Sequence, residues 1–186
     1  MSIEKLRWMV LASLMAALTA VGAYIHVPIG PVPIVLSTLF VILSGLLLGS
    51  RWGLTSMALY LLVGAIGIPV FAGGKGGLAH FLGPTGGYLF GYLLASWMTG
   101  FISERSRGLM ALDILAVVVG SLMIYAFGVP WLKMVTQMSW QKALIAGALP
   151  FLIGDAVKAF AVLILARALR PVLKRQLQSP SPHSGL

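Results

Sequence analysis

The sequence contains no cysteine and few charged residues. Its 186 residues include 4 Asp and Glu against 13 Lys and Arg, so that charged residues make up 9% of the chain. Without cysteine, neither a disulfide framework nor a thiolate metal site can form. Soluble domains carry about a quarter charged and roughly 45–50% apolar residues, whereas 59% of this chain is apolar. A water-soluble fold of this size could not bury so much apolar surface, and the composition therefore predicts an integral membrane protein.

The apolar residues gather in stretches close to the roughly 20 residues with which a helix crosses a bilayer. A span must be helical because backbone amides in lipid need partners within their own segment. The alternating segments of about ten residues that form an outer-membrane barrel do not occur. We predict an all-α fold, a single bundle of six transmembrane helices, over residues 6–25, 32–49, 52–70, 83–102, 109–129 and 146–169.

This bundle is expected to form one membrane domain, residues 1–170. A basic tail rich in Ser and Pro follows, residues 171–186, and is expected to be disordered. The first span also follows basic residues, as a cleaved signal peptide would, but its apolar run exceeds the usual roughly 7–15 residues of a signal core.

The basic residues predict the orientation. If the N-terminus is cytoplasmic, the outer side holds Lys75, Lys133 and Lys142. The inner side then holds nine basic residues, namely Lys5, Arg7, Arg51, Arg105, Arg107, Arg167, Arg170, Lys174 and Arg175. This excess follows the positive-inside rule and places both termini in the cytoplasm. Because orientation accounts for the basic residues, the net charge of +9 does not indicate a nucleic-acid partner.

Two charged residues lie inside the sixth predicted span. Asp155 and Lys158 are three residues apart and therefore share one helical face. Charged groups at this depth are costly and usually face a bundle interior or a water-filled cavity. The pair could be a neutralising ion pair that only fixes helix packing. The functional interpretation is a ligand site open to the outside, in which Lys158 meets an anion and Asp155 accepts hydrogen bonds.

A second candidate lies at the outer start of the fourth span, in the run from Phe81 to Tyr88. Gly86 and Gly87 would let the backbone approach a ligand, Thr85 adds a hydroxyl, and Tyr88 adds an aromatic wall with a polar tip. The alternative is a turn followed by close helix packing, because glycines recur here at four-residue spacing.

Two further features each leave two interpretations open. Lys75 lies in the glycine-rich segment 72–77, which could close over a ligand or be an ordinary connection; it is not a P-loop, because no Ser or Thr follows the lysine. Ala12, Ala16 and Ala20 form a stripe of small residues, which could serve packing within the bundle or docking to another membrane protein. The residues by themselves favour internal packing.

Catalysis finds little support in the sequence. The chain has neither a G-x-S-x-G nor an H-E-x-x-H motif, and His26, His80 and His183 lie far apart. We therefore expect no enzyme activity, no nucleotide site, no cofactor and no metal in this chain.

Four segments together resemble the BioY family, the biotin-specific substrate-binding (S) components of energy-coupling factor (ECF) transporters. The resemblance covers about residues 6–169, and the G-P-T-G-G-Y run joined to D-x-x-K in the last span is its more specific part. The segments are Gly30-Pro31-Val32-Pro33-Ile34, Gly67-Ile68-Pro69-Val70-Phe71, Leu82-Gly83-Pro84-Thr85-Gly86-Gly87-Tyr88-Leu89 and Gly154-Asp155-Ala156-Val157-Lys158-Ala159.

The resemblance implies a six-helix subunit of the bacterial cell membrane that captures biotin from outside. It also implies partners, a transmembrane coupling protein and two cytoplasmic ATPases that drive uptake. Asp155 and Lys158 would contact biotin, and the stripe on the first helix would dock to the coupling protein. The chain departs from the family after the second span begins, where Ser37 stands in place of a glutamine-containing polar pattern.

Three other functions remain open at this point. A standalone vitamin or small-solute transporter would use the same site without ATPases. An intramembrane enzyme would use Asp155 as a base, and a purely structural membrane protein would bind no ligand.

Overall fold

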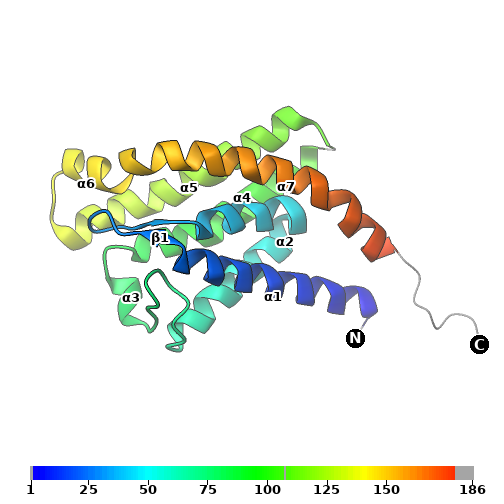
Figure 1. The fold of residues 1–186 in the computed structure, drawn as a ribbon, viewed down its shortest axis with the longest axis horizontal. Coiled ribbons are helices and arrows are strands. Elements are labelled where there is room, and N and C mark those ends of the chain that lie inside the picture. Colours follow the sequence, from blue (N-terminus) through cyan, green and yellow to red (C-terminus); the bar gives the residue numbers. More distant parts are fainter. Residues whose placement is uncertain (1, 107, 179–186) are drawn as a thin grey trace, which may run out of the picture.

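The computed structural model describes residues 2–106 and 108–178. Its long helices lie side by side in a bundle (Figure 1). They are α1 (Ile3–Tyr24), α2 (Ser37–Ala65), α4 (Gly86–Ser106), α5 (Met110–Thr136) and α7 (Leu152–Gln178). The shorter elements are β1 (His26–Val27), β2 (Ile34–Val35), α3 (Ala79–Leu82), α6 (Trp140–Gly147) and the 3-10 turn η1 (Leu149–Phe151).

Helix α2 contains the second and third predicted spans. Gly49, with φ of 78°, breaks the regular helix between two arms, and this left-handed conformation is one that glycine adopts without strain. The carboxylate of Glu104 accepts hydrogen bonds from the backbone N–H and the hydroxyl of Ser50 at 2.7 and 2.9 Å, so the second arm begins with a partner for its free amide. With the two arms counted separately, the long helices of the described residues match the six predicted spans.

Length and composition make four helical segments long and apolar enough to cross a membrane, Ile3–Tyr24, Ser37–Ala65, Met110–Thr136 and Trp140–Leu173. The outward face of α7 has the character of a lipid-facing surface, because Ile153, Val157 and Phe160 recur at helical spacing and are 82, 68 and 69% exposed. These features are those of a multi-pass membrane protein.

Two helices continue through prolines near which the predicted spans end. Helix α5 passes through Pro130 to Thr136, and α7 passes through Pro171 to Gln178. Residues 171–178 are therefore helical rather than part of a disordered tail, and residues 179–186 lie outside the described residues. Membrane helices tolerate proline because neighbouring groups satisfy the one carbonyl that it releases. Pro150 lies in η1, just ahead of α7.

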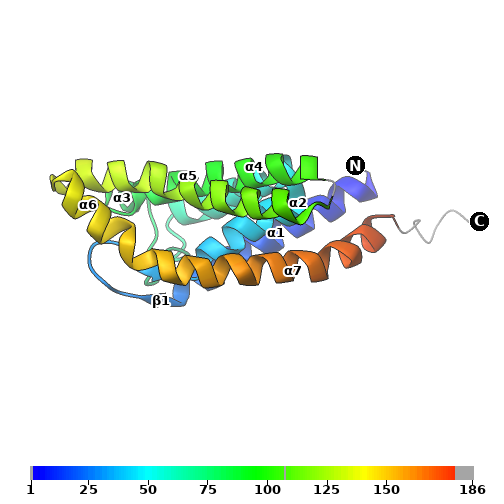
Figure 2. The same ribbon diagram turned by 90° about the horizontal axis from the view of Figure 1, so that it is seen from above.

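The bundle has two distinct ends. The start of α1 and the last turns of α7 lie at the same end (Figures 1 and 2). There Arg170 of α7 meets both carboxylate oxygens of Asp113 of α5, at 2.5 and 2.9 Å, and donates to Ser103 of α4 at 2.8 Å. Helix α6 and the β1–β2 hairpin lie at the opposite end.

Candidate functional site

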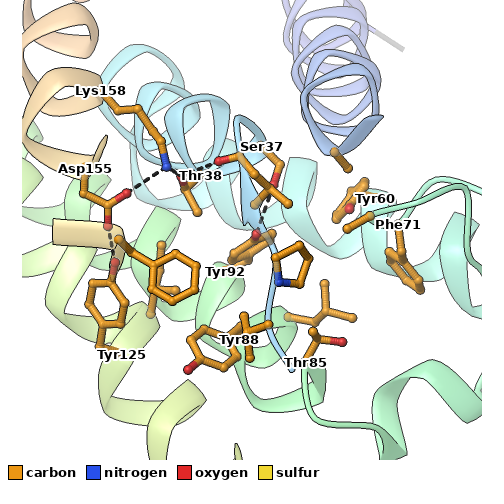
Figure 3. A pocket seen from close by; sticks show the side chains of 18 of the residues that line it. Ser37, Thr38, Tyr60, Phe71, Thr85, Tyr88, Tyr92, Tyr125, Asp155 and Lys158 are labelled. Carbon is orange, nitrogen blue, oxygen red and sulfur yellow. Dashed lines mark hydrogen bonds and ion pairs between the residues drawn. The ribbon is translucent and has the colours of Figure 1, made fainter. Parts of the chain in front are cut away.

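A pocket opens between the helices, and Figure 3 shows it from close by. Its empty volume, counting the open mouth, is about 590 Å³. Its lining comes from both arms of α2, the start of α4, α5 and the start of α7, together with the segments around residues 32–35 and 71–72. Much of the wall is aromatic, formed by Tyr60, Phe71, Tyr88, Tyr92, Tyr125 and Phe151.

The polar side of the pocket is an ion pair. The ammonium of Lys158 lies 2.8 Å from Oδ1 of Asp155, and the two side chains are 13 and 19% exposed. Both residues line the pocket. The structure thus brings together the two residues that the sequence placed on one helical face.

Two further residues complete this polar cluster. Lys158 also donates to the hydroxyl of Thr38 at 3.0 Å, and the hydroxyl of Tyr125 donates to the second carboxylate oxygen of Asp155. Figure 3 shows that the cluster draws its members from α2, α5 and α7. Among the described residues, these contacts use two of the three N–H bonds of the ammonium, and the third is available to a ligand.

A buried pair of hydroxyls lies beside this cluster. Ser37 and Tyr92 are 3.0 Å apart and both line the pocket. Ser37, expected as a shorter substitute for a glutamine, therefore reaches the site. Its hydroxyl bonds to the wall of the pocket rather than standing free.

The residues of the predicted run from Phe81 to Tyr88, at the start of α4, have two different roles. Thr85 and Tyr88 line the pocket, and the hydroxyl of Tyr88 donates to the carbonyl of Gly147 at 2.8 Å. At Gly87 an added Cβ would collide with the side chain of Trp131 of α5, and at Gly86 it would collide first with the backbone carbonyl of Phe81 and then with the Trp131 ring. The two glycines thus allow a tight turn and close packing of α4 on α5, the alternative that the sequence had left open.

Lys75 is not brought to the ion pair. It lines an outer groove with an empty volume of about 760 Å³. The groove and the pocket share Pro33, Ala72, His80 and Thr85, so the groove forms the approach to the pocket. At this junction, the pKa of the His80 imidazole is lowered below its ordinary value. The main cause is partial burial of the side chain, and the second cause is the positive charge of Lys75.

The alanine stripe on α1 faces the interior of the bundle. Ala12 and Ala16 are buried at 2 and 6% exposure. Ala12 packs with Leu48 of α2, and Ala20 packs against the main core. A docking surface made of these three residues is therefore not supported, because α2 covers the face that they share. Internal packing, which the residues alone favoured, is what the structure shows.

Sequence reasoning missed most of the wall. Tyr60, Tyr92 and Tyr125 lie far apart along the chain, and only the bundle brings them together. The available signal was their phenolic hydroxyls within apolar spans, which need buried partners. Nothing in the sequence marked Thr38 or His80 as residues of the pocket.

The arrangement suits a small amphipathic molecule. Asp155 offers an acceptor, Lys158 and the surrounding hydroxyls offer donors, and the aromatic wall covers apolar surface. A few convergent polar groups in a mostly apolar cavity are the usual composition of a small-molecule site.

Comparison with known proteins gives consistent matches over nearly the whole chain. The family model described as "BioY family" matches residues 1–175. A probable biotin transporter BioY from Pyrococcus horikoshii is 45% identical over 160 residues, which cover 86% of this chain and 94% of the relative. The biotin transporter BioY of Thermotoga maritima is 39% identical, with 89% of this chain and 96% of the relative covered.

A solved structure agrees in fold. The crystal structure of the S-component for biotin from an ECF-type ABC transporter superposes with a TM-score of 0.85 and 29% sequence identity, covering 92% of this chain and 95% of that chain. The relatives are named as transporters, which agrees with the expectation that the chain is not an enzyme. The chain belongs to the BioY family.

Proposed function

We propose that this chain is a membrane-embedded substrate-binding subunit for biotin uptake. The observation that carries the proposal is the Asp155–Lys158 pair, held at 2.8 Å at one side of an aromatic pocket. Biotin combines a ureido ring, an apolar bicycle and a carboxylate on an alkyl chain. The donors, the acceptor and the aromatic wall of the pocket provide complementary groups for such a molecule.

Within this function, Asp155, Lys158, Thr85 and Tyr88 bind the ligand directly. The first two make polar contacts, and the last two line the cavity, Thr85 where it meets the outer groove. Lys75 acts from the outer groove. No ligand contact is assigned to Gly86 or Gly87, because Gly86 packs against the backbone of Phe81 and Gly87 packs against Trp131 of α5.

The subunit works with an ATP-driven ECF module, made of a transmembrane coupling protein and two cytoplasmic ATPases. Support comes from the similarity to an S-component of an ECF-type ABC transporter. The subunit lies in the bacterial plasma membrane with both termini cytoplasmic. The end of the bundle where α1 begins and α7 ends then faces inward, and the end with α6 and the β1–β2 hairpin faces outward.

Uptake of labelled biotin by biotin-auxotrophic cells tests this function. Cells that express the chain together with an ECF module should accumulate biotin, and cells that express the chain alone should accumulate far less. A matched control carries Lys142→Gln, which changes an exposed lysine of α6 outside the pocket. Equal uptake without the module would contradict the ATP-driven partnership, and no uptake in either strain by a properly inserted protein would contradict the function.

A further inference from the structure

A second large cavity lies between the second arm of α2, α3 and the start of α4. We call it the lateral groove; its empty volume, counting the open side, is about 970 Å³. Its lining includes Ala58 and Ala65 of α2, Phe81 and Leu82 of α3, and Phe90 of α4. All the residues that line it in the described part of the chain are apolar. The groove therefore suits a hydrocarbon chain and offers a polar ligand no side-chain partner.

The lateral groove is part of the apolar surface that faces lipid. Ala58 and Ala65 belong to the third predicted span, and Phe90 belongs to the fourth. From Phe90 the exposed apolar surface continues along α4 through Trp97 and Phe101, at helical spacing. In the bilayer core there is no water to fill such a groove, and an empty groove would leave its walls without packing contacts. Because the groove is continuous with the lipid-facing surface, a lipid chain is the occupant that this surface supplies.

The charged residue nearest to the groove in the sequence is positive. Lys75 is the only Lys, Arg, Asp or Glu between Arg51 and Glu104. It is exposed, and it lies three residues before Leu78, which lines the groove. The charge of Lys75 acts on His80 of α3, so the ammonium lies near this short helix. A phospholipid carries a negative phosphate next to its acyl chains, and the ammonium of Lys75 is complementary to that charge.

The lateral groove and the pocket share a wall. Phe81 lines the groove and packs edge-on against Phe71, with 5.5 Å between the ring centroids. Phe71 is fully buried and lines the pocket, and it also stacks on His80 at 5.1 Å between ring centroids. No residue of α3 is buried, and Leu82 is exposed where it lines the groove. An occupant of the groove would therefore support α3 and, through Phe81 and Phe71, the wall of the pocket.

We infer that an acyl chain of a phospholipid occupies the lateral groove, with the lipid phosphate toward Lys75, and holds α3 and the shared wall in place. Removal of this lipid should loosen the wall and weaken biotin binding, a consequence that rests on the proposed function. A phenylalanine ring introduced on the α2 side of the groove should displace the chain and support the wall in its place.

Native mass spectrometry of the full-length protein, purified in detergent and incubated with phosphatidylglycerol, tests the lipid site without biotin. The wild-type protein should retain a bound phospholipid, and Ala58→Phe, which fills the groove, should retain about tenfold less. Ala65→Phe, two helical turns further along α2, is a second filling variant should the first fail to fold. The matched control Ala111→Phe changes an exposed alanine of α5 outside the groove and should retain lipid as the wild-type protein does.

The position of the phosphate is tested by Lys75→Gln. This variant should retain about threefold less phosphatidylglycerol, the loss of one exposed ionic contact. Equal retention by Lys75→Gln and the wild-type protein would overturn the placement of the phosphate. Equal retention by the wild-type protein and the folded filling variants, or no retention by the wild-type protein, would overturn the lipid site itself.

Calorimetric titration with biotin tests the support of the wall. Delipidated wild-type protein should bind biotin about fivefold more weakly than lipid-loaded protein, because the wall is then formed in only part of the molecules. The affinity of a folded filling variant should not depend on lipid. Equal affinity of delipidated and lipid-loaded wild-type protein would overturn the supporting role. Failure of lipid-loaded, folded wild-type protein to bind biotin would instead contradict the proposed function, and the lipid retention would still establish the groove as a lipid site.

Discussion

The ammonium of Lys158 donates a hydrogen bond at 3.0 Å to the hydroxyl of Thr38. This contact joins α7 to the first turn of α2, two helices that are separated by most of the chain. Because Lys158 also pairs with Asp155 at 2.8 Å, its ammonium is held in place by two partners, one on α2 and one on α7. A small molecule that enters the pocket therefore meets a cation whose direction is already fixed, which lowers the entropy cost of binding.

Thr38→Val should weaken biotin binding. The substitution keeps the shape of the side chain but removes the acceptor for Lys158, and a hydrogen bond to a charged group contributes about 1.5–3 kcal/mol. We expect a dissociation constant at least tenfold higher in calorimetry. Thr55→Val, an exposed site on the same helix, should bind biotin as the wild-type protein does. Equal affinity of both variants would mean that Thr38 does not position the lysine.

Gly87→Ala should destabilise the bundle. An added Cβ would collide with Trp131 of α5, and overpacking of this kind costs about 1–3 kcal/mol. The matched control is Gly154→Ala in α7, where nothing lies within 4 Å of the added Cβ and alanine is a better helix former by about 0.5–1 kcal/mol. Thermal unfolding in detergent should show a lower midpoint for Gly87→Ala only. A midpoint that is unchanged in Gly87→Ala would show that α4 and α5 can separate without cost.

Arg170→Lys should destabilise the end of the bundle opposite the pocket. The guanidinium spans both oxygens of Asp113 at 2.5 and 2.9 Å, and an ammonium cannot reproduce this two-point contact. We expect a loss of about 1–3 kcal/mol in the free energy of unfolding. Arg167→Lys, at an exposed site on the same helix, should change it by less than about 0.5 kcal/mol. Equal stability of the two variants would contradict a structural role for the Arg170 pair.

Acidification should destabilise the protein through His80. Because the pKa of His80 is lowered in the folded protein, the unfolded chain binds a proton between the ordinary value of about 6.5 and the lower folded value, and the folded chain does not. The stabilising contribution is therefore present above about pH 6.5 and is lost as the pH falls toward the folded value. Thermal midpoints from pH 7.5 to 5 should fall more steeply for the wild-type protein than for His80→Gln. Parallel curves would contradict this assignment.

The features of the fold and of the site that depend on residues close together in the chain could be predicted from the sequence. Asp155 and Lys158 could be placed on one face because a separation of three residues is a property of any helix. Gly49 falls at the predicted break between the second and third spans, where its positive φ permits the turn. These inferences depend on neighbours along the chain, which the sequence displays directly.

Relationships between helices could not be predicted in the same way. Tyr125 and Thr38 reach the ion pair from α5 and α2. The pattern of residues within one helix does not indicate which other helix packs against it. The small residues of α1 showed that something packs closely against them, but not that α2 does. The helices also continue through Pro130 and Pro171, since proline biases a helix toward its end without compelling it to stop.

The central claim is that the Asp155–Lys158 pair binds biotin. Its most direct test is calorimetric titration of biotin into the detergent-purified wild-type protein and into Asp155→Ala and Lys158→Ala, with thermal unfolding to verify that each variant is folded. We predict tight binding by the wild-type protein and a loss of at least 100-fold in each folded variant, or about 2.7 kcal/mol. Undiminished binding by both variants, or no binding by the folded wild-type protein, would contradict the account.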